Sequence, residues 1–170
     1  MKSHLRCFAI FIVLIAGAGC GRSGSQASAI APDFRLNDLT GLTVFLNAQL
    51  HRPVILTFFA TWCTPCRDEI PTLVDLHKRY QNRIQVLCID VDPENIDTIH
   101  SIAAALKIPY PILLDEGRRT MERYGVQKLP TTFLIDTKGR IMSRYGAIGE
   151  AEIRSLSEQI ERLVNVAHGK

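Results

Sequence analysis

Two cysteines separated by two residues, Cys63 and Cys66, lie between a hydrophobic run and an amphipathic segment of the chain. The preceding run, 54–59, is rich in β-branched and aromatic residues, which is typical of a strand buried in the centre of a sheet. The segment after the pair, 70–80, carries its apolar residues at helical spacing. The sequence therefore predicts a strand, a short turn and a helix, with both cysteines at the first turn of the helix.

The first turn of a helix favours a thiolate. Backbone N–H groups there lack acceptors within the helix, and the helix dipole places partial positive charge at the same end. Both effects lower the pKa of a cysteine, so we expect Cys63 to be nucleophilic. Cys66, one turn further on, can close a disulfide with it, and Pro65 suits a position that needs no N–H. A purely stabilising disulfide is the alternative, but so small a loop removes little chain entropy.

The residues around the pair resemble the thioredoxin superfamily, and more narrowly the exported bacterial thiol-disulfide oxidoreductases of the TlpA/ResA type. The resemblance covers about residues 31–165 and is carried by Trp62-Cys63-Thr64-Pro65-Cys66-Arg67, followed by Glu69 and Pro71. It implies an α/β protein with the thioredoxin fold, in which helices flank a central mixed sheet. It also implies an N-terminal β-hairpin and a central insertion of a strand and a helix, at about 92–114.

The hydrophobic pattern supports this fold from the residues themselves. Hydrophobic strands that alternate with helices indicate an α/β sheet with a parallel centre. Turn residues at 38–41 and 137–139 predict two hairpins. After the cysteine helix, the expected elements are a strand at 84–90, a helix at 95–106, a strand at 112–114, a helix at 118–124 stopped by Gly125, strands at 131–136 and 140–145, and a closing helix at 150–166.

The cysteine pair predicts dithiol–disulfide exchange, in which Cys63 attacks and Cys66 resolves the mixed disulfide. This reaction requires no metal and no organic cofactor. Trp62 is expected to shield the pair and to contact the partner, with a core tryptophan as the alternative. Thr64 and Pro65, which separate the cysteines, are expected to help set the reduction potential.

Two further site residues follow from the resemblance. Relatives of the ResA type carry a glutamate three residues after the second cysteine, which matches Glu69 and implies a proton acceptor for the pair. Thioredoxins proper use a buried aspartate in the preceding strand, where this chain has Thr57. Alternatively, Glu69 only favours the helix N-terminus through the dipole. The run Leu-Pro-Thr-Thr-Phe-Leu-Ile resembles the family's cis-proline loop, which implies that Pro130 faces the cysteines after a cis peptide bond.

The first residues resemble an export signal. Lys2 and Arg6 precede an apolar stretch, 7–18, that is shorter than the roughly 20 residues needed to span a bilayer. The run up to Cys20 resembles a bacterial lipoprotein cleavage site, although Gly17 lies where an aliphatic residue is usual. An ordinary signal peptide or an uncleaved anchor is the alternative. We therefore expect a signal peptide at 1–19, a lipid on Cys20, a flexible tether at 20–31 and a thioredoxin-like domain at 32–170.

The net charge after the N-terminal segment bears on the kinds of partner that the protein can bind. Of 20 lysines and arginines, Lys2 and Arg6 lie before Cys20, which leaves 18 against 17 acidic residues. This near-neutral balance implies no nucleic-acid partner.

Cys88 lies in the predicted strand 84–90, where we expect a small buried hydrophobe, with a resolving or regulatory thiol as the alternative.

These features predict an exported thiol-disulfide oxidoreductase, in the bacterial periplasm or at the outer face of a membrane. The resemblance favours a membrane-tethered reductant that acts on a disulfide of another exported protein, for example in cytochrome c maturation or metal-centre assembly. Reduction in an oxidising compartment requires electrons from across the membrane, so a transmembrane electron donor is implied as a partner. The opposite direction, an oxidant, and an isomerase stay open.

Two other classes are weighed against this prediction. Peroxiredoxins begin with a segment similar to 31–34, but their reactive cysteine normally follows a Pro-x-x-x-Thr-x-x pattern, which is absent before Cys63. Related copper chaperones use two cysteines separated by three residues and a later histidine, whereas this chain has two residues between its cysteines and no histidine near Pro130. Copper(I) would still bind two soft thiolates. A peroxiredoxin-like peroxidase and a thiolate copper chaperone are therefore the alternatives.

Overall fold

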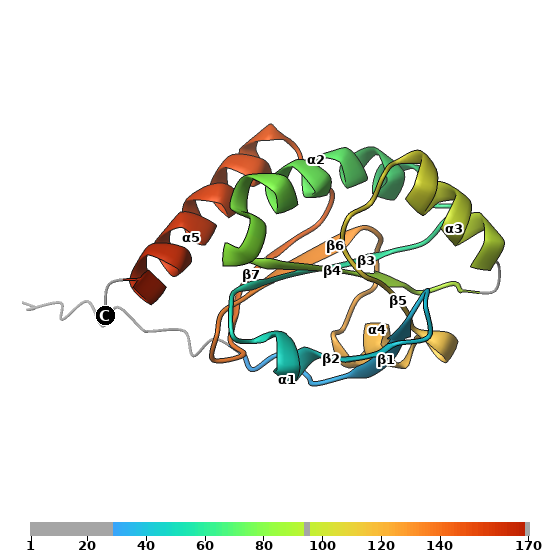
Figure 1. The fold of residues 1–170 in the computed structure, drawn as a ribbon, viewed down its shortest axis with the longest axis horizontal. Helices are drawn as coiled ribbons and strands as arrows, with labels where there is room; N and C mark the ends of the chain where they lie inside the picture. The colour runs from blue at the N-terminus through green and yellow to red at the C-terminus, as the bar shows by residue number, and fades with distance from the viewer. Residues whose placement is uncertain (1–28, 94–95, 169–170) are drawn as a thin grey trace, which may run out of the picture.

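A computed structural model describes residues 29–93 and 96–168 of the chain (Figure 1). The predicted signal peptide, the predicted lipidation site Cys20 and most of the predicted tether lie outside these residues. The described part forms a seven-stranded mixed sheet with helices on both faces, in the strand order β2-β1-β5-β4-β3-β6-β7. This architecture confirms the predicted thioredoxin fold.

The strands are those that the hydrophobic pattern predicts, within a few residues at their ends. Strands β3, β4 and β5 run parallel to one another, and the remaining pairs are antiparallel. The strands are β1 (Arg35–Asp38), β2 (Thr43–Phe45), β3 (Val54–Phe59), β4 (Gln85–Asp90), β5 (Ile112–Leu114), β6 (Thr131–Ile135) and β7 (Ile141–Tyr145).

The helices form two layers around the sheet. Helices α2, α3 and α5 cover one face, and α1 and α4 lie on the other (Figure 1). Their bounds are α1 (Leu46–Gln49), α2 (Thr64–Tyr80), α3 (Ile96–Ala105), α4 (Arg119–Arg123) and α5 (Glu150–His168), with short 3-10 turns η1 (Gln81–Arg83) and η2 (Glu116–Arg118). Within the described ranges, no helix is both long enough and apolar enough to cross a bilayer.

The core lies at the centre of the sheet, where strands are covered on both faces. All six residues of β3 and all six of β4 are buried, which explains why both read as continuous hydrophobic runs. Phe58 on β3 packs against Tyr124 and Phe133, with ring centroids 5.3 and 6.0 Å apart. The cysteine helix α2 therefore starts from a rigid strand end.

The predicted N-terminal hairpin and central insertion are joined in the sheet. Asp38 stabilises the hairpin turn, because its Oδ1 accepts hydrogen bonds from the backbone N–H groups of Thr40 and Leu42, at 2.8 and 3.0 Å. Gly41 has a φ of +84°, which a residue with a side chain adopts only with strain. The inserted strand β5 pairs with β4 on one side and with β1 on the other. The insertion therefore connects the hairpin to the rest of the sheet.

The last residues of the predicted tether already belong to the fold. The N–H of Ala31 donates to the carbonyl of Gly139 at 2.8 Å, and the carbonyl of Ala29 accepts from the N–H of Ile141 at 2.8 Å. Ile30 forms a bridge with Arg140. The ordered chain thus includes Ala29–Ala31, which lies before the predicted domain start at residue 32.

Asp115 connects β5 to α4 through two hydrogen bonds. Its side chain is 1% exposed, and its oxygens accept from the backbone N–H groups of Thr120 and Met121, at 3.0 and 2.8 Å. We expect Asp115→Ala to lower the free energy of unfolding by about 2 kcal/mol, because two N–H groups at a helix start lose their acceptor. Urea unfolding measures this change. Glu116→Ala, at an exposed neighbour, is the control, and an equal loss there would contradict the assignment.

Candidate active site

The cysteine pair lies where β3 ends and α2 begins. Cys63 is the N-cap residue of α2, and its Sγ accepts a hydrogen bond from the N–H of Cys66 at 3.3 Å. The two sulfurs form a disulfide with an S–S distance of 2.00 Å. Pro65 occupies the first turn, where a missing N–H costs nothing. The sulfur of Cys63 thus receives an N–H at the positive end of the helix dipole, an environment that stabilises a thiolate after reduction.

A cavity of about 500 Å³ lies beside Cys63, and we call it the Cys63 cavity. Cys66 does not line it and is 2% exposed, against 5% for Cys63. An incoming sulfur therefore reaches Cys63 first. The lining residues come from the cysteine turn, the end of β4 and the segment around α4: Trp62, Cys63, Thr64, Pro65, Val91, Arg118, Met121, Gln127 and Leu129.

Trp62 forms one rim of this cavity and is 62% exposed, so the alternative of a core tryptophan is wrong. Its indole N–H donates to Asp92 Oδ2 at 2.7 Å. The other carboxylate oxygen of Asp92 pairs with Arg118 at 3.0 Å, and Arg118 Nε also donates to the carbonyl of Val91. The indole is therefore held in place by Asp92 and, through it, by Arg118, and neither residue was predicted as part of the site.

Glu69 is buried in α2, one helical turn after Cys66, and is 5% exposed. Its Oε1 accepts a hydrogen bond from the N–H of Ile148 at 2.6 Å. Burial raises the pKa of Glu69 from its ordinary value of 4.5 to about 7, and this hydrogen bond opposes the rise. Residues three apart on a helix lie on one face, so Glu69 and Cys66 share a face of α2. At neutral pH such a group can both accept and return a proton.

Other buried titratable groups lie near Glu69. Cys88 is a free thiol at 1% exposure, which confirms the predicted buried hydrophobe, and burial raises its pKa, helped by the charges of Asp90 and Glu69. Burial also raises the pKa of Asp90 to about 6 and raises that of Tyr110. The Oδ2 of Asp90 and the hydroxyl of Tyr110 have no hydrogen-bond partner among the described residues. An aspartate at the carboxyl end of a parallel strand, such as Asp90, was a signal that sequence reasoning passed over.

The loop before β6 completes the site. The Leu129–Pro130 peptide bond is cis, as the resemblance implies, Pro130 is buried, and Leu129 lines the Cys63 cavity. Thr57, in the strand position where thioredoxins proper have an aspartate, is 1% exposed, and its hydroxyl accepts from Thr132 Oγ1 at 2.8 Å. The hydroxyl pair cannot take up a proton at neutral pH. Among the acidic residues that are both buried and titratable near neutral pH, Glu69 is therefore the one closest in sequence to the cysteine pair.

No group of three or more histidine, cysteine, aspartate or glutamate side chains is arranged to hold a metal ion in the part of the chain that the structure describes. The two sulfurs themselves are bonded to each other. A sulfur pair at a helix N-terminus, beside a cavity and a cis-proline loop on a thioredoxin fold, defines a class of redox protein, the thiol-disulfide oxidoreductases.

Comparison with known proteins agrees with this class. The chain belongs to the AhpC/TSA family, which it matches over residues 27–144. It is 29% identical over 141 residues to the thiol-disulfide oxidoreductase ResA of Bacillus subtilis (strain 168), covering 76% of this chain and 78% of that protein. The protein is a thiol-disulfide oxidoreductase, and the predicted resemblance to the ResA type is confirmed.

Solved structures show the same relationship. A protein from Chlorobium tepidum assigned as thiol:disulfide interchange protein DsbE superposes with a TM-score of 0.75 and 29% identity, covering 81% of this chain and 97% of that one. A protein from Bacteroides thetaiotaomicron assigned as a protein disulfide isomerase superposes with a TM-score of 0.76 and 27% identity, covering 84% and 92%. The fold and the general activity are therefore shared, whereas the named roles of these proteins differ.

Proposed function

We propose that this protein is an exported reductant of protein disulfides that acts through Cys63 and Cys66. The observation that supports it best is the disulfide between these residues at the N-terminus of α2, with Cys63 open to a cavity and Cys66 behind it. In this proposal Glu69 and Pro130 support the reaction of the pair.

The proposed reaction starts from the reduced pair. The thiolate of Cys63 attacks one sulfur of the substrate disulfide, a new S–S bond joins Cys63 to the substrate, and the second substrate sulfur leaves as a thiolate. Cys66 then loses its proton and attacks the sulfur of Cys63. This step forms the Cys63–Cys66 disulfide and releases the first substrate sulfur as a thiolate. Two electrons pass to the substrate, and the structure represents the oxidised product.

Each supporting residue has a place in this scheme. Glu69 accepts the proton that Cys66 must lose, since its pKa of about 7 leaves part of it ionised at neutral pH. Leu129 and Trp62 border the cavity and, together with the neighbouring Pro130, bind the substrate backbone next to the reactive sulfur. Thr64 and Pro65 fix the turn between the cysteines and so influence the stability of the thiolate, which contributes to the reduction potential.

The location and the direction of the reaction come from the sequence. The N-terminal segment, with Lys2, Arg6 and the run up to Cys20, supports export and attachment to a membrane through a lipid on Cys20. In an oxidising compartment the disulfide between Cys63 and Cys66 must be reduced again for each turnover. A transmembrane electron donor is therefore the second partner, besides the disulfide-bearing exported substrate, for instance a protein of cytochrome c maturation or metal-centre assembly.

The reduction potential of the Cys63–Cys66 pair tests the direction. We expect a value near or below that of thioredoxin, about −270 mV, because a reductant must have a lower reduction potential than its substrate. The chain from Gly21 onward, which lacks Cys7 and Cys20, is equilibrated with glutathione or dithiothreitol buffers and the oxidised fraction is measured. A value near that of the strong oxidants, about −120 mV, would reverse the proposed direction.

The alternatives differ from this proposal in what they consume or bind. A peroxiredoxin-like peroxidase reduces hydrogen peroxide at the expense of thiols, whereas the proposed reductant consumes protein disulfides. A copper chaperone binds Cu(I) at the reduced Cys63 and Cys66 with a stoichiometry of one and delivers it to a partner. Peroxide consumption and Cu(I) titration of the reduced protein therefore separate the three functions.

A further inference from the structure

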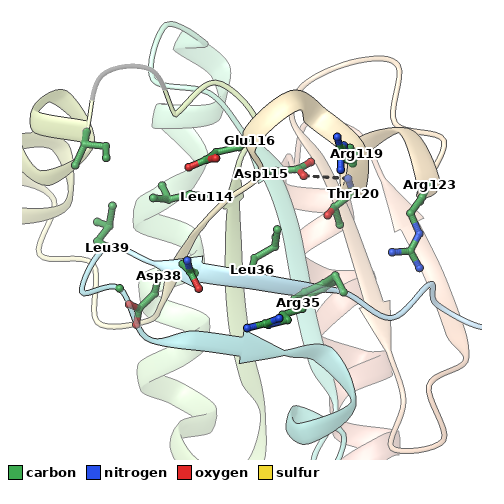
Figure 2. Close-up of a pocket in the computed structure, with 14 residues that line it drawn as sticks. Arg35, Leu36, Asp38, Leu39, Leu114, Asp115, Glu116, Arg119, Thr120 and Arg123 are labelled. Carbon is green, nitrogen blue, oxygen red and sulfur yellow. Dashed lines mark hydrogen bonds between the residues drawn. The ribbon is translucent and has the colours of Figure 1, made fainter.

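Three adjoining hollows lead away from Cys63 across the surface. The Cys63 cavity shares Val91 and Arg118 with a hollow of about 440 Å³ over η2, and that hollow shares Glu116 with a pocket of about 750 Å³. The third of these hollows, the largest of the three, lies between β1 and α4, and we call it the β1–α4 pocket (Figure 2). A polypeptide whose disulfide is bound at Cys63 can therefore continue along η2 into this pocket.

The β1–α4 pocket has an apolar end and a basic end. Leu39 and Leu114 lie at one end in Figure 2, whereas Arg119 and Arg123 project from α4 at the other, and Arg35 lies on β1 below Leu36, between the two ends. All three arginines are exposed. The pocket therefore offers a contact for an apolar side chain and, further along, several guanidinium groups.

The guanidinium groups have no carboxylate partner within the described residues. The ion pairs found in 29–93 and 96–168 are Arg118–Asp92 and Arg140–Asp136, so Arg35, Arg119 and Arg123 are outside every one of them. Arg35 lies over the ring of Phe45 at 5.8 Å, which leaves its N–H groups available. Three unpaired guanidinium groups around one pocket attract carboxylates, which they can bind in bidentate fashion.

Two of the three acidic residues that line the pocket are engaged in hydrogen bonds. Both oxygens of Asp115 accept backbone N–H groups at the start of α4. Asp38 lies at the apolar end, where its Oδ1 accepts three hydrogen bonds within the hairpin turn. Glu116 is at the boundary with the η2 hollow. The charge at the α4 end of the pocket is therefore positive, and its complement is acidic.

We propose that the β1–α4 pocket is a docking site for an acidic segment of the disulfide-bearing substrate protein. The segment passes from Cys63 along η2, and its carboxylates bind Arg119, Arg123 and Arg35. This inference rests on the proposed function and adds the substrate class. The substrates are exported proteins that carry an acidic segment close in sequence to the disulfide that is reduced. Complementary charge also speeds the encounter, so the effect is strongest at low ionic strength.

Matched model peptides test the proposal on the reduced full chain in detergent. Each peptide carries one cysteine in a disulfide with thionitrobenzoate, a spacer, and a segment of four glutamates, four glutamines or four lysines. Spacers of about 4, 8 and 12 residues cover the track, since an extended residue spans about 3.3 Å. Cys63 attacks the disulfide and releases coloured thionitrobenzoate, and Cys66 then frees the peptide thiol. The Cys63→Ser protein supplies the background rate from other thiols.

The parent protein is expected to react about three to ten times faster with the glutamate peptide than with the glutamine peptide at low salt. The double variant Arg119→Glu/Arg123→Glu should lose this preference and favour the lysine peptide. The control, Arg79→Glu/Arg154→Glu, has the same net charge but alters exposed arginines on α2 and α5, on the opposite face of the sheet (Figure 1). It should keep the preference of the parent.

Two results would overturn the proposal. One is equal rates of the parent with the glutamate and glutamine peptides at every spacer length. The other is an equal loss of preference in the Arg79→Glu/Arg154→Glu control, which would indicate net charge and not the pocket. The symmetric disulfide of thionitrobenzoate, 5,5′-dithiobis(2-nitrobenzoate), serves as a small substrate without a peptide. If that disulfide is not reduced either, the proposed chemistry of Cys63 fails, whereas normal reduction of it with no charge preference contradicts the docking site alone.

Discussion

Replacement of Cys63 by serine is expected to slow disulfide exchange by more than about a thousandfold. A serine hydroxyl is not ionised at neutral pH and cannot form the disulfide that ends the reaction, so neither half of the proposed mechanism can proceed. Cys66→Ser should act differently, because Cys63 can still attack at the cavity. That variant is expected to stop at the mixed disulfide between Cys63 and the substrate, since the resolving thiol is missing.

The two variants are compared by exchange rate and by mass spectrometry of the trapped product. Cys88→Ala is the matched control, because Cys88 is buried with a raised pKa and plays no part in the proposed reaction. Its rate should remain within about twofold of the parent, since a buried thiol with a raised pKa is not a nucleophile. A Cys63→Ser protein that retained exchange through Cys88 or Cys66 would refute the assigned order of attack.

Glu69→Gln is expected to change the pH dependence of both stability and exchange. The folded pKa of Glu69, about 7, lies above its ordinary value of 4.5. The folded state therefore binds more protons between these values, so the parent loses stability as the pH rises from about 4.5 through 7. The loss amounts to at most about 3 kcal/mol. Glutamine keeps the acceptor for the N–H of Ile148 but does not ionise, so the variant should not show this loss.

Two measurements check this prediction. Urea unfolding of the oxidised parent and variant between pH 4 and pH 8 should give stability curves that diverge as the pH rises, with the variant more stable at the alkaline end. The exchange rate of the reduced variant should fall, and the pKa values of Cys63 and Cys66 should shift, because the proton acceptor is gone. Asp68→Asn, at an exposed neighbour on α2, is the control. Parallel stability curves, or unchanged cysteine pKa values and rates, would remove Glu69 from the mechanism.

Local patterns predicted most of the fold because they encode local structure. The continuous hydrophobic runs of β3 and β4 indicated strands covered on both faces, and both are buried throughout. Gly125 was expected to stop a helix in the left-handed region, and it follows α4 with a φ of +59°. The predicted start of that helix at Arg118 was one residue early, because Arg118 itself has a φ of +60° and belongs to the turn η2.

The site was predicted only in part, because most of its contacts join distant segments. The spacing of Cys63 and Cys66 is a local signal, and so is a glutamate one turn after the pair. The hydrogen bond from Ile148 to Glu69 spans 79 residues, and that from Trp62 to Asp92 spans 30. Trp62 was expected to contact the partner, but nothing near it in the sequence indicated that Asp92 would hold its indole N–H. Such pairs appear only when the sheet order is known.

The chain enters the fold at the end of the domain that lies away from the cysteine pair. Ala29 and Ala31 pair beside the turn between β6 and β7, and β6 runs antiparallel to β3, with Ile135 opposite Val54 and Thr131 opposite Phe58. That turn is therefore at the opposite end of β3 from Cys63, about 20 Å away along six strand residues. Under the proposed attachment through Cys20, the first described residues therefore lie at the end of the domain away from the reactive sulfur. The proposed electron donor in the bilayer then reaches that sulfur only by extending a domain of its own or after this domain turns on its tether. Under this proposal, re-reduction of the pair and reduction of the substrate occur in different orientations.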